Sequence, residues 1–159
     1  MNNDLLKTKY EQIIEAIENA VTGGITWIDT AEYYADGYAE TLIGTALKGA
    51  KRSSYQLCSK VWKTHLHRDD VWRAAENSLN RLKTDHFDLY LYHQIDESVP
   101  LEETIDALNE LAEQKIALNI GVSNFNTERL ERAMKLSQAP IVVNQVEYSL
   151  VCREPEKDL

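Results

Sequence analysis

Hydrophobic and polar positions along this chain follow two alternating patterns. Stretches with apolar residues every three or four positions predict amphipathic helices, and short continuous apolar runs between them predict strands. Helices are expected at residues 4–21, 40–49, 69–82, 105–111 and 130–136. Strands are expected at residues 25–28, 55–59, 87–92, 117–122 and 141–143. The chain therefore alternates helix and strand from one end to the other.

The spacing of these elements predicts the topology. Strands recur about every 30 residues with one helix between neighbours, which is the period of a unit with two parallel strands and a crossover helix. Gly23-Gly24 ends the first helix, because glycine accepts the left-handed turn found at many helix C-termini. The expected fold class is α/β, with about five parallel strands and five helices.

Each predicted strand ends in a polar residue. The residues at these five positions are Asp29, Lys60, His93, Ser123-Asn124 and Gln145. Parallel strands connected in this way place all their C-terminal ends at one edge of the sheet, so these side chains should converge there. One polar strand end has an ordinary structural explanation, such as a loop cap, whereas five together indicate a functional site.

The residue types in this set suggest acid–base chemistry. An acid such as Asp29 beside Lys60 keeps the ammonium charged, and an ammonium beside a phenol stabilises the phenolate that remains after proton donation. Both Tyr33 and Tyr34 follow Asp29, and composition leaves open which of them is the proton donor. A neutral His93 would orient a carbonyl by a hydrogen bond.

Composition narrows the class of partner. A net charge of −9 and a pI near 4.9 would repel a phosphate backbone, so a nucleic-acid partner is not expected. No apolar run approaches the roughly 20 residues of a spanning helix, and the first residues lack a secretory signal, so we expect no membrane partner and a cytoplasmic protein.

Metal and phosphate motifs are not expected. Cys58 and Cys152 lie far apart, and His65 and His67 lack the clustered partners of a zinc site, so no metal is predicted. The chain contains neither GxGxxG nor GxxxxGK[ST], which disfavours an unrelated nucleotide or phosphate site. Trp62, just past Lys60, could form the wall of a substrate pocket.

Several motifs, in order along the chain, resemble those of the aldo-keto reductases. They are GITWIDTA at residues 24–31 with Tyr34, ETLIG at 40–44, SKV at 59–61, DLYLYH at 88–93, GVSNF at 121–125 and NQVEY at 144–148. The match runs from about Tyr10 to the last residue. The spacing within the family motif selects Tyr34 over Tyr33 as the catalytic phenol.

This resemblance implies an NADPH-dependent reductase of aldehydes and ketones on a (β/α)₈ TIM barrel. Asp29, Tyr34, Lys60 and His93 would be catalytic, with Tyr34 protonating the carbonyl oxygen. The nicotinamide carboxamide of NADPH would be held by Ser123, Asn124 and Gln145. The partner would be a small-molecule carbonyl substrate.

The chain also departs from the family pattern. A TIM barrel typically needs about 250 residues, and a family member should carry a strand before the first helix and two further strand and helix units at the end. Residues 1–159 are therefore expected to form a single, partial TIM-barrel domain, with residues 154–159 opening a further helix. Open strand edges predict either self-association or a fragment of a longer gene.

Two classes of function follow. The first is aldo-keto reductase activity, impaired by truncation, with weak cofactor binding because much of the dinucleotide surface is absent. The second is a non-catalytic scaffold or regulatory subunit of the same fold, or an inactive fragment of a longer enzyme. Retention of the four catalytic residue types favours a catalytic ancestry.

Overall fold

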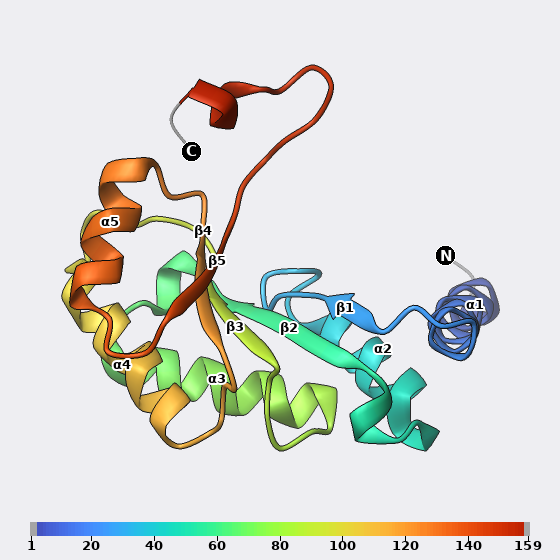
Figure 1. Cartoon of the computed structure of the whole chain (residues 1–159). Coiled ribbons are helices and arrows are strands. Elements are labelled where there is room, and N and C mark those ends of the chain that lie inside the picture. Colours follow the sequence, from blue (N-terminus) through green and yellow to red (C-terminus); the bar gives the residue numbers. More distant parts are fainter. Residues whose placement is uncertain (1–2, 158–159) are drawn as a thin grey trace.

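The computed structural model describes residues 3–157, in which five α-helices alternate with five strands (Figure 1). The helices are α1 (Asn3–Thr22), α2 (Tyr38–Ala46), α3 (Arg68–Leu82), α4 (Leu101–Glu113) and α5 (Thr127–Leu136). The strands are β1 (Trp27–Asp29), β2 (Gln56–Val61), β3 (Leu89–Tyr92), β4 (Ile120–Ser123) and β5 (Ile141–Gln145). Short 3₁₀ helices are η1 (Leu47–Gly49), η2 (Arg52–Ser54), η3 (Lys63–His65) and η4 (Glu154–Lys157).

The strands form one sheet in the order in which they occur along the chain, β1-β2-β3-β4-β5, and every neighbouring pair is parallel. The register sets Asp29 opposite Cys58 and Lys60 opposite Leu91. Within residues 3–157 the sheet does not close, so β1 and β5 each keep one unpaired edge. The expected class, parallel strand and helix repeats forming an incomplete barrel, is confirmed.

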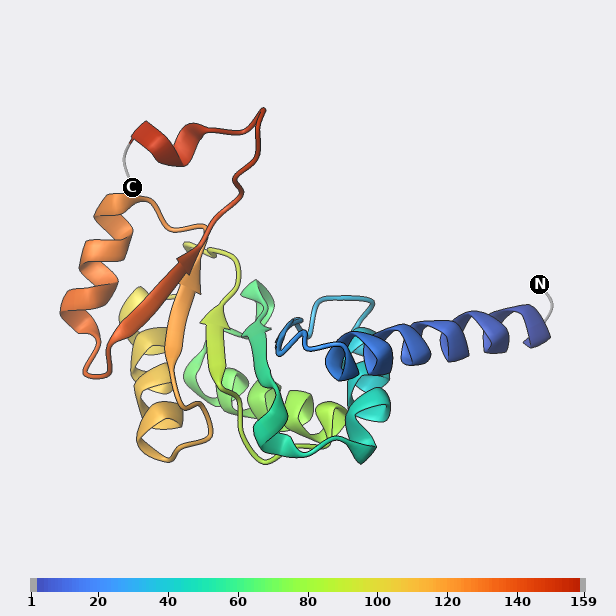
Figure 2. The same ribbon diagram turned by 45° about the vertical axis from the view of Figure 1, so that its right-hand side comes forward.

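Helices α2 to α5 cover one face of this sheet, as Figures 1 and 2 show. Strand residues alternate between the two faces, so every second side chain points toward the helices. The large apolar core lies on that face, where strand residues pack against the helices; those strand residues are Leu57, Val61, Tyr90, Tyr92, Ile120 and Val122. Burial of this core stabilises the layer arrangement, since each fully buried large apolar side chain contributes about 1.5–3 kcal/mol.

The opposite face carries the alternate strand residues. Cys58, Leu89 and Leu91 form a second, smaller apolar cluster, against which Val143 packs. No helix lies on this face in the described part of the chain (Figures 1 and 2). This inner face corresponds to the interior of a barrel and carries the polar residues of the candidate site.

Several element boundaries differ from those expected. Lys60 was expected at the end of its strand, but β2 continues to Val61, so Lys60 lies within the sheet. The second helix begins earlier, at Tyr38 after the Gly37 N-cap, and its last residues tighten into η1. Ala117 forms only an isolated bridge with Phe87, which shortens the expected fourth strand.

The two ends of the described chain extend away from the sheet. Helix α1 lies beside α2, where Tyr10 and Tyr38 meet edge to face at 5.0 Å, and it projects outward (Figure 2). The segment after β5 rises beyond the carboxyl ends of the strands and finishes in η4, in the region where a further helix was expected; residues 158 and 159 lie outside the described range. None of the described helices is both long and apolar enough to cross a membrane.

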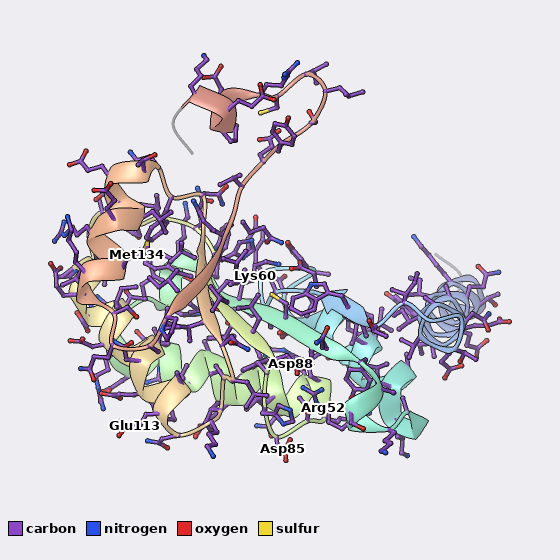
Figure 3. The ribbon with its side chains drawn as sticks, in the orientation of Figure 1. Arg52, Lys60, Asp85, Asp88, Glu113 and Met134 are labelled. Carbon is purple, nitrogen blue, oxygen red and sulfur yellow. The ribbon has the colours of Figure 1, made fainter. Side chains whose placement is uncertain are left out.

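A network at the amino ends of the strands fixes the opposite edge of the sheet. Arg52 and Asp88 form an ion pair at 2.6 Å, and Asp88 also accepts a hydrogen bond from the Leu57 amide at 2.8 Å. Figure 3 shows Arg52, Asp85 and Asp88 together at this edge, away from Lys60. The acidic and basic groups of this edge therefore serve the scaffold.

Gly44 of α2 packs closely against the backbone at the end of α3, and this contact leads to the first prediction. A Cβ at this position would lie 2.3 Å from the carbonyl oxygen of Arg81 and 2.8 Å from the backbone of Leu82, neither of which can rotate away. We expect Gly44→Ala to lower the free energy of unfolding by about 2–3 kcal/mol through overpacking, measured by urea denaturation. Gly49→Ala is the matched control, because nothing lies within 4 Å of a Cβ there. Equal stability of the two variants would contradict this packing.

Candidate active site

Lys60 stands at the centre of the candidate site, on the inner face of β2 (Figure 3). The side chain is 0% exposed, and its ammonium donates hydrogen bonds to the Asp29 carboxylate, to the Thr30 carbonyl at 2.8 Å and to the Tyr34 hydroxyl at 3.4 Å. An ammonium has three N–H donors, so these three acceptors satisfy all of them. A buried charge is tolerated only when paired and hydrogen-bonded in this way.

Asp29 supplies the countercharge at the end of β1. Its second carboxylate oxygen accepts a hydrogen bond from the Gln145 side-chain amide at 3.1 Å. Burial raises the pKa of the neighbouring Cys58 thiol, and the Asp29 charge adds to the effect. Cys58 therefore stays a neutral thiol below the ion pair.

The two tyrosines after Asp29 point to different partners. The Tyr34 hydroxyl lies beside the Lys60 ammonium, whereas the Tyr33 ring stacks on Trp62 with centroids 3.8 Å apart. Tyr34 is 39% exposed as a whole residue. The geometry thus favours Tyr34 as the proton donor and gives Tyr33 a packing contact.

His93 follows β3 and completes the group. Its ring meets the rings of Tyr34 and Trp62 edge to face, at 5.6 and 5.0 Å. Burial, together with the nearby Lys60 charge, lowers the pKa of His93 to about 4. The imidazole is therefore neutral near pH 7 and offers one N–H donor, while its buried Nδ1 has no partner in the described part of the protein.

The polar residues at the end of β4, Ser123 and Asn124, lie on the same edge, beside His93. Ser123 Oγ donates to the Gln145 carbonyl at 2.8 Å, and the Asn124 backbone amide donates to the same oxygen at 2.9 Å. The Asn124 side-chain amide donates to the His93 carbonyl at 3.1 Å. All seven sequence-predicted residues, and Trp62, therefore gather at one edge of the sheet.

The loop that presents Tyr34 is conformationally unusual. Ala35, Asp36 and Gly37 have positive φ angles of 51°, 52° and 81° in succession. Such strain persists only where the surroundings hold it. Arg81 lies directly beneath Gly37 and forms an ion pair at 2.7 Å with Glu40, whose carboxylate is fully buried.

The sequence alone does not single out Glu32 as a residue of this site. Glu32 accepts hydrogen bonds from the Trp62 backbone amide at 2.6 Å and from His65 Nδ1 at 3.0 Å. An acid inside the same motif as Asp29 and Tyr34 was the available signal, but the sequence does not show which neighbouring loop it would meet.

Comparison with known proteins identifies the family of this chain. The family model described as "Aldo/keto reductase family" matches residues 1–159. The chain belongs to the aldo/keto reductase family. The resemblance expected from the sequence motifs is therefore confirmed.

Individual relatives share both sequence and fold with this family member. Aldo-keto reductase YhdN of Bacillus subtilis is 39% identical over 155 residues, which is 92% of this chain and 46% of YhdN. The crystal structure of the thermostable aldo-keto reductase Tm1743 with the inhibitor epalrestat superposes with a TM-score of 0.92 at 48% identity, covering 94% of this chain and 55% of that one. An aldo/keto reductase from Klebsiella pneumoniae, solved with NADP and acetate, gives a TM-score of 0.85 at 38% identity, covering 96% and 53%. The chain thus spans about half the length of these relatives.

The lowered pKa of His93 generates a prediction about stability. Its pKa is about 4 in the folded protein against an ordinary value of 6.5, so the unfolded chain binds the proton more tightly. Stability is complete above pH 6.5 and falls as the pH drops toward 4. We expect His93→Gln to reduce this fall by about 1 kcal/mol, allowing for solvent screening at a half-exposed site. Urea denaturation at several pH values measures it.

The control for this experiment is His67→Gln, which removes an exposed histidine paired with Glu103 outside the site. It should keep a pH dependence close to that of the unmodified protein. An unchanged pH profile in His93→Gln would contradict burial of a neutral imidazole at this position.

Proposed function

We propose that this chain, as a single partial-barrel domain, carries the catalytic centre of an NADPH-dependent reductase of aldehydes and ketones. The observation that carries the proposal is the buried Lys60 ammonium, shared between the Asp29 carboxylate and the Tyr34 hydroxyl, with His93 beside them. A buried lysine of this kind costs stability as a purely structural element. The pKa of His93 beside it is lowered by burial, and shifts of this kind cluster at functional sites. Family membership and the NADP-bound relative from Klebsiella pneumoniae support the same conclusion.

The polar groups at the carboxyl ends of β4 and β5 suit the carboxamide of a nicotinamide ring. A carboxamide presents both N–H donors and a carbonyl acceptor, and Ser123, Asn124 and Gln145 offer a hydroxyl and two side-chain amides with both kinds of group. Bound NADPH would supply the hydride. Among the described residues after β5, Arg153 and Lys157 form exposed ion pairs with Glu156 and Glu154.

Each catalytic residue then has a definite part. Tyr34 donates its hydroxyl proton to the carbonyl oxygen of the substrate, and the Lys60 ammonium stabilises the phenolate that remains. Asp29 holds Lys60 in position and balances its charge. Neutral His93 donates an N–H to the same carbonyl oxygen and so orients the substrate. Trp62, whose ring touches that of His93, forms a wall of the substrate pocket.

The proton donor generates the third prediction. Tyr34→Phe keeps the ring but removes the hydroxyl beside Lys60, so kcat/KM for an aldehyde should fall about 10²-fold or more. The rate is measured from the loss of NADPH absorbance. Binding is measured separately by fluorescence titration with NADPH, and it should be nearly unchanged in the variant.

Tyr33→Phe is the matched control, because its ring stacks on Trp62 and its hydroxyl is not needed for that contact. It should keep most of the activity. Turnover that survives in Tyr34→Phe would refute the assignment. NADPH binding without turnover in the unmodified chain, or no binding at all, would instead support a scaffold or an inactive fragment.

The fourth prediction concerns assembly. We infer that two copies associate, because the outer edges of β1 and β5 are unpaired in residues 3–157, and large apolar side chains after β5 are exposed. Leu150 and Val151 are 98% and 97% exposed, which a soluble protein normally avoids for adjacent apolar residues. Light scattering after size exclusion should show a dimer that becomes monomeric in Leu150→Asp/Val151→Asp. A monomer at every concentration tested would contradict it.

A further inference from the structure

The carboxylate of Glu32 joins two loops at the catalytic edge of the sheet. Glu32 belongs to the loop after β1, and its side chain is only 9% exposed. One of its oxygens accepts hydrogen bonds from the Trp62 backbone amide at 2.6 Å and from His65 Nδ1 at 3.0 Å. Trp62 and His65 lie at the two ends of the turn after β2, which contains η3. A single carboxylate therefore binds both ends of this turn, which a backbone hydrogen bond from the His65 amide to the Trp62 carbonyl also closes at 2.9 Å.

Trp62 is held from two sides by the same short segment. Its backbone is bound by Glu32, and its ring stacks on that of Tyr33, the next residue, at 3.8 Å with an interplanar angle of 18°. The other side of the Trp62 ring system approaches His93 at 5.0 Å and an angle of 72°. Three consecutive residues thus make these contacts: Glu32 with the Trp62 backbone, Tyr33 with the Trp62 ring, and Tyr34 with the Lys60 ammonium.

The hydrogen bond is strong enough to determine where the loop lies. Hydrogen bonds to an ionised acceptor are short and about twice as strong as neutral ones. The Trp62 backbone adopts an extended conformation at the N-cap of η3, where the amide needs an acceptor from outside the turn. Glu32 supplies that acceptor. Removing it leaves the amide without a partner, and the Trp62 ring then keeps its stacking on Tyr33 but loses the anchor on its backbone amide.

We propose that Glu32 is a positioning residue that fixes Trp62 against His93 and thereby shapes the pocket for the carbonyl substrate. This role rests on the proposed function for its kinetic consequence, but its structural part concerns Trp62 alone. Glu32 itself contacts neither Lys60 nor the proton donor through its carboxylate. Its loss should therefore weaken substrate binding far more than it slows proton transfer.

The test isolates the signal of Trp62. In a Trp27→Phe/Trp72→Phe background, Trp62 is the one remaining tryptophan. Quenching of its fluorescence by acrylamide then measures how accessible the Trp62 ring is to solvent. We expect Glu32→Ala to raise the quenching constant about twofold, and Glu32→Gln to stay close to the parent because its amide oxygen still accepts the Trp62 N–H. Glu76→Ala, which removes an exposed acid on α3, is the matched control and should change nothing.

Steady-state kinetics provide the second readout. Glu32→Ala should raise KM for an aldehyde about fivefold or more and change kcat less than twofold, with recovery in Glu32→Gln. A loss of kcat at unchanged KM would overturn the proposal, as would a folded Glu32→Ala variant in which Trp62 quenching is unaltered. Far-UV circular dichroism establishes folding.

The positioning role of Glu32 and the proposed reductase function are tested by different outcomes. If no variant, including the parent, oxidises NADPH, the proposed function fails while quenching still decides whether Glu32 positions Trp62. If the parent is active but Glu32→Ala matches it in KM and quenching, the positioning role fails and the catalytic assignment stands.

Discussion

The buried ammonium of Lys60 is the constraint on which the rest of this site depends. A charge with no exposed surface requires full compensation, and three acceptors provide it: the Asp29 carboxylate, the Thr30 carbonyl and the Tyr34 hydroxyl. Asp29 and Thr30 lie within reach of Lys60 because β1 pairs in parallel with β2, with Asp29 opposite Cys58. The strand register therefore also sets the geometry of the candidate site.

A second buried charge supports the first from the helical face. Glu40 is fully buried on α2, where it accepts a hydrogen bond from Ser59 at 2.6 Å and pairs with Arg81 of α3. Ser59 and Lys60 are neighbours on β2, so their side chains point to opposite faces of the sheet. Each belongs to a different ionic network, Ser59 with Glu40 and Lys60 with Asp29. Arg81 also fills the space beneath Gly37, which restrains the left-handed loop that carries Tyr34. The strain of that loop is thus offset by contacts outside the catalytic group.

The sequence predicts the alternation of strand and helix because hydrophobic periodicity records burial directly. It also predicts which strand ends converge, because parallel topology leaves no alternative edge. It does not predict the Gln145 contact with Asp29, which spans the inner face between residues 116 positions apart. Nor does it choose between Tyr33 and Tyr34 without the family motif, since the choice depends on loop angles that local propensity does not specify. The predicted strand ends near Lys60 and Ala117 are wrong for a similar reason. Where a strand begins or ends depends on its hydrogen bonds to the neighbouring strand.

The two halves of the proposed site differ in how much structure they need. The proton-donating group comes from β1, β2 and the residue after β3, three consecutive and directly paired strands. Pairing between neighbouring parallel strands is enough to bring Asp29, Lys60 and His93 together. The nicotinamide subsite instead depends on β4 and β5 and on the contact of Gln145 with Asp29 across the open face. We therefore expect the proposed cofactor contacts to depend more than the proposed proton donor on whatever covers that face.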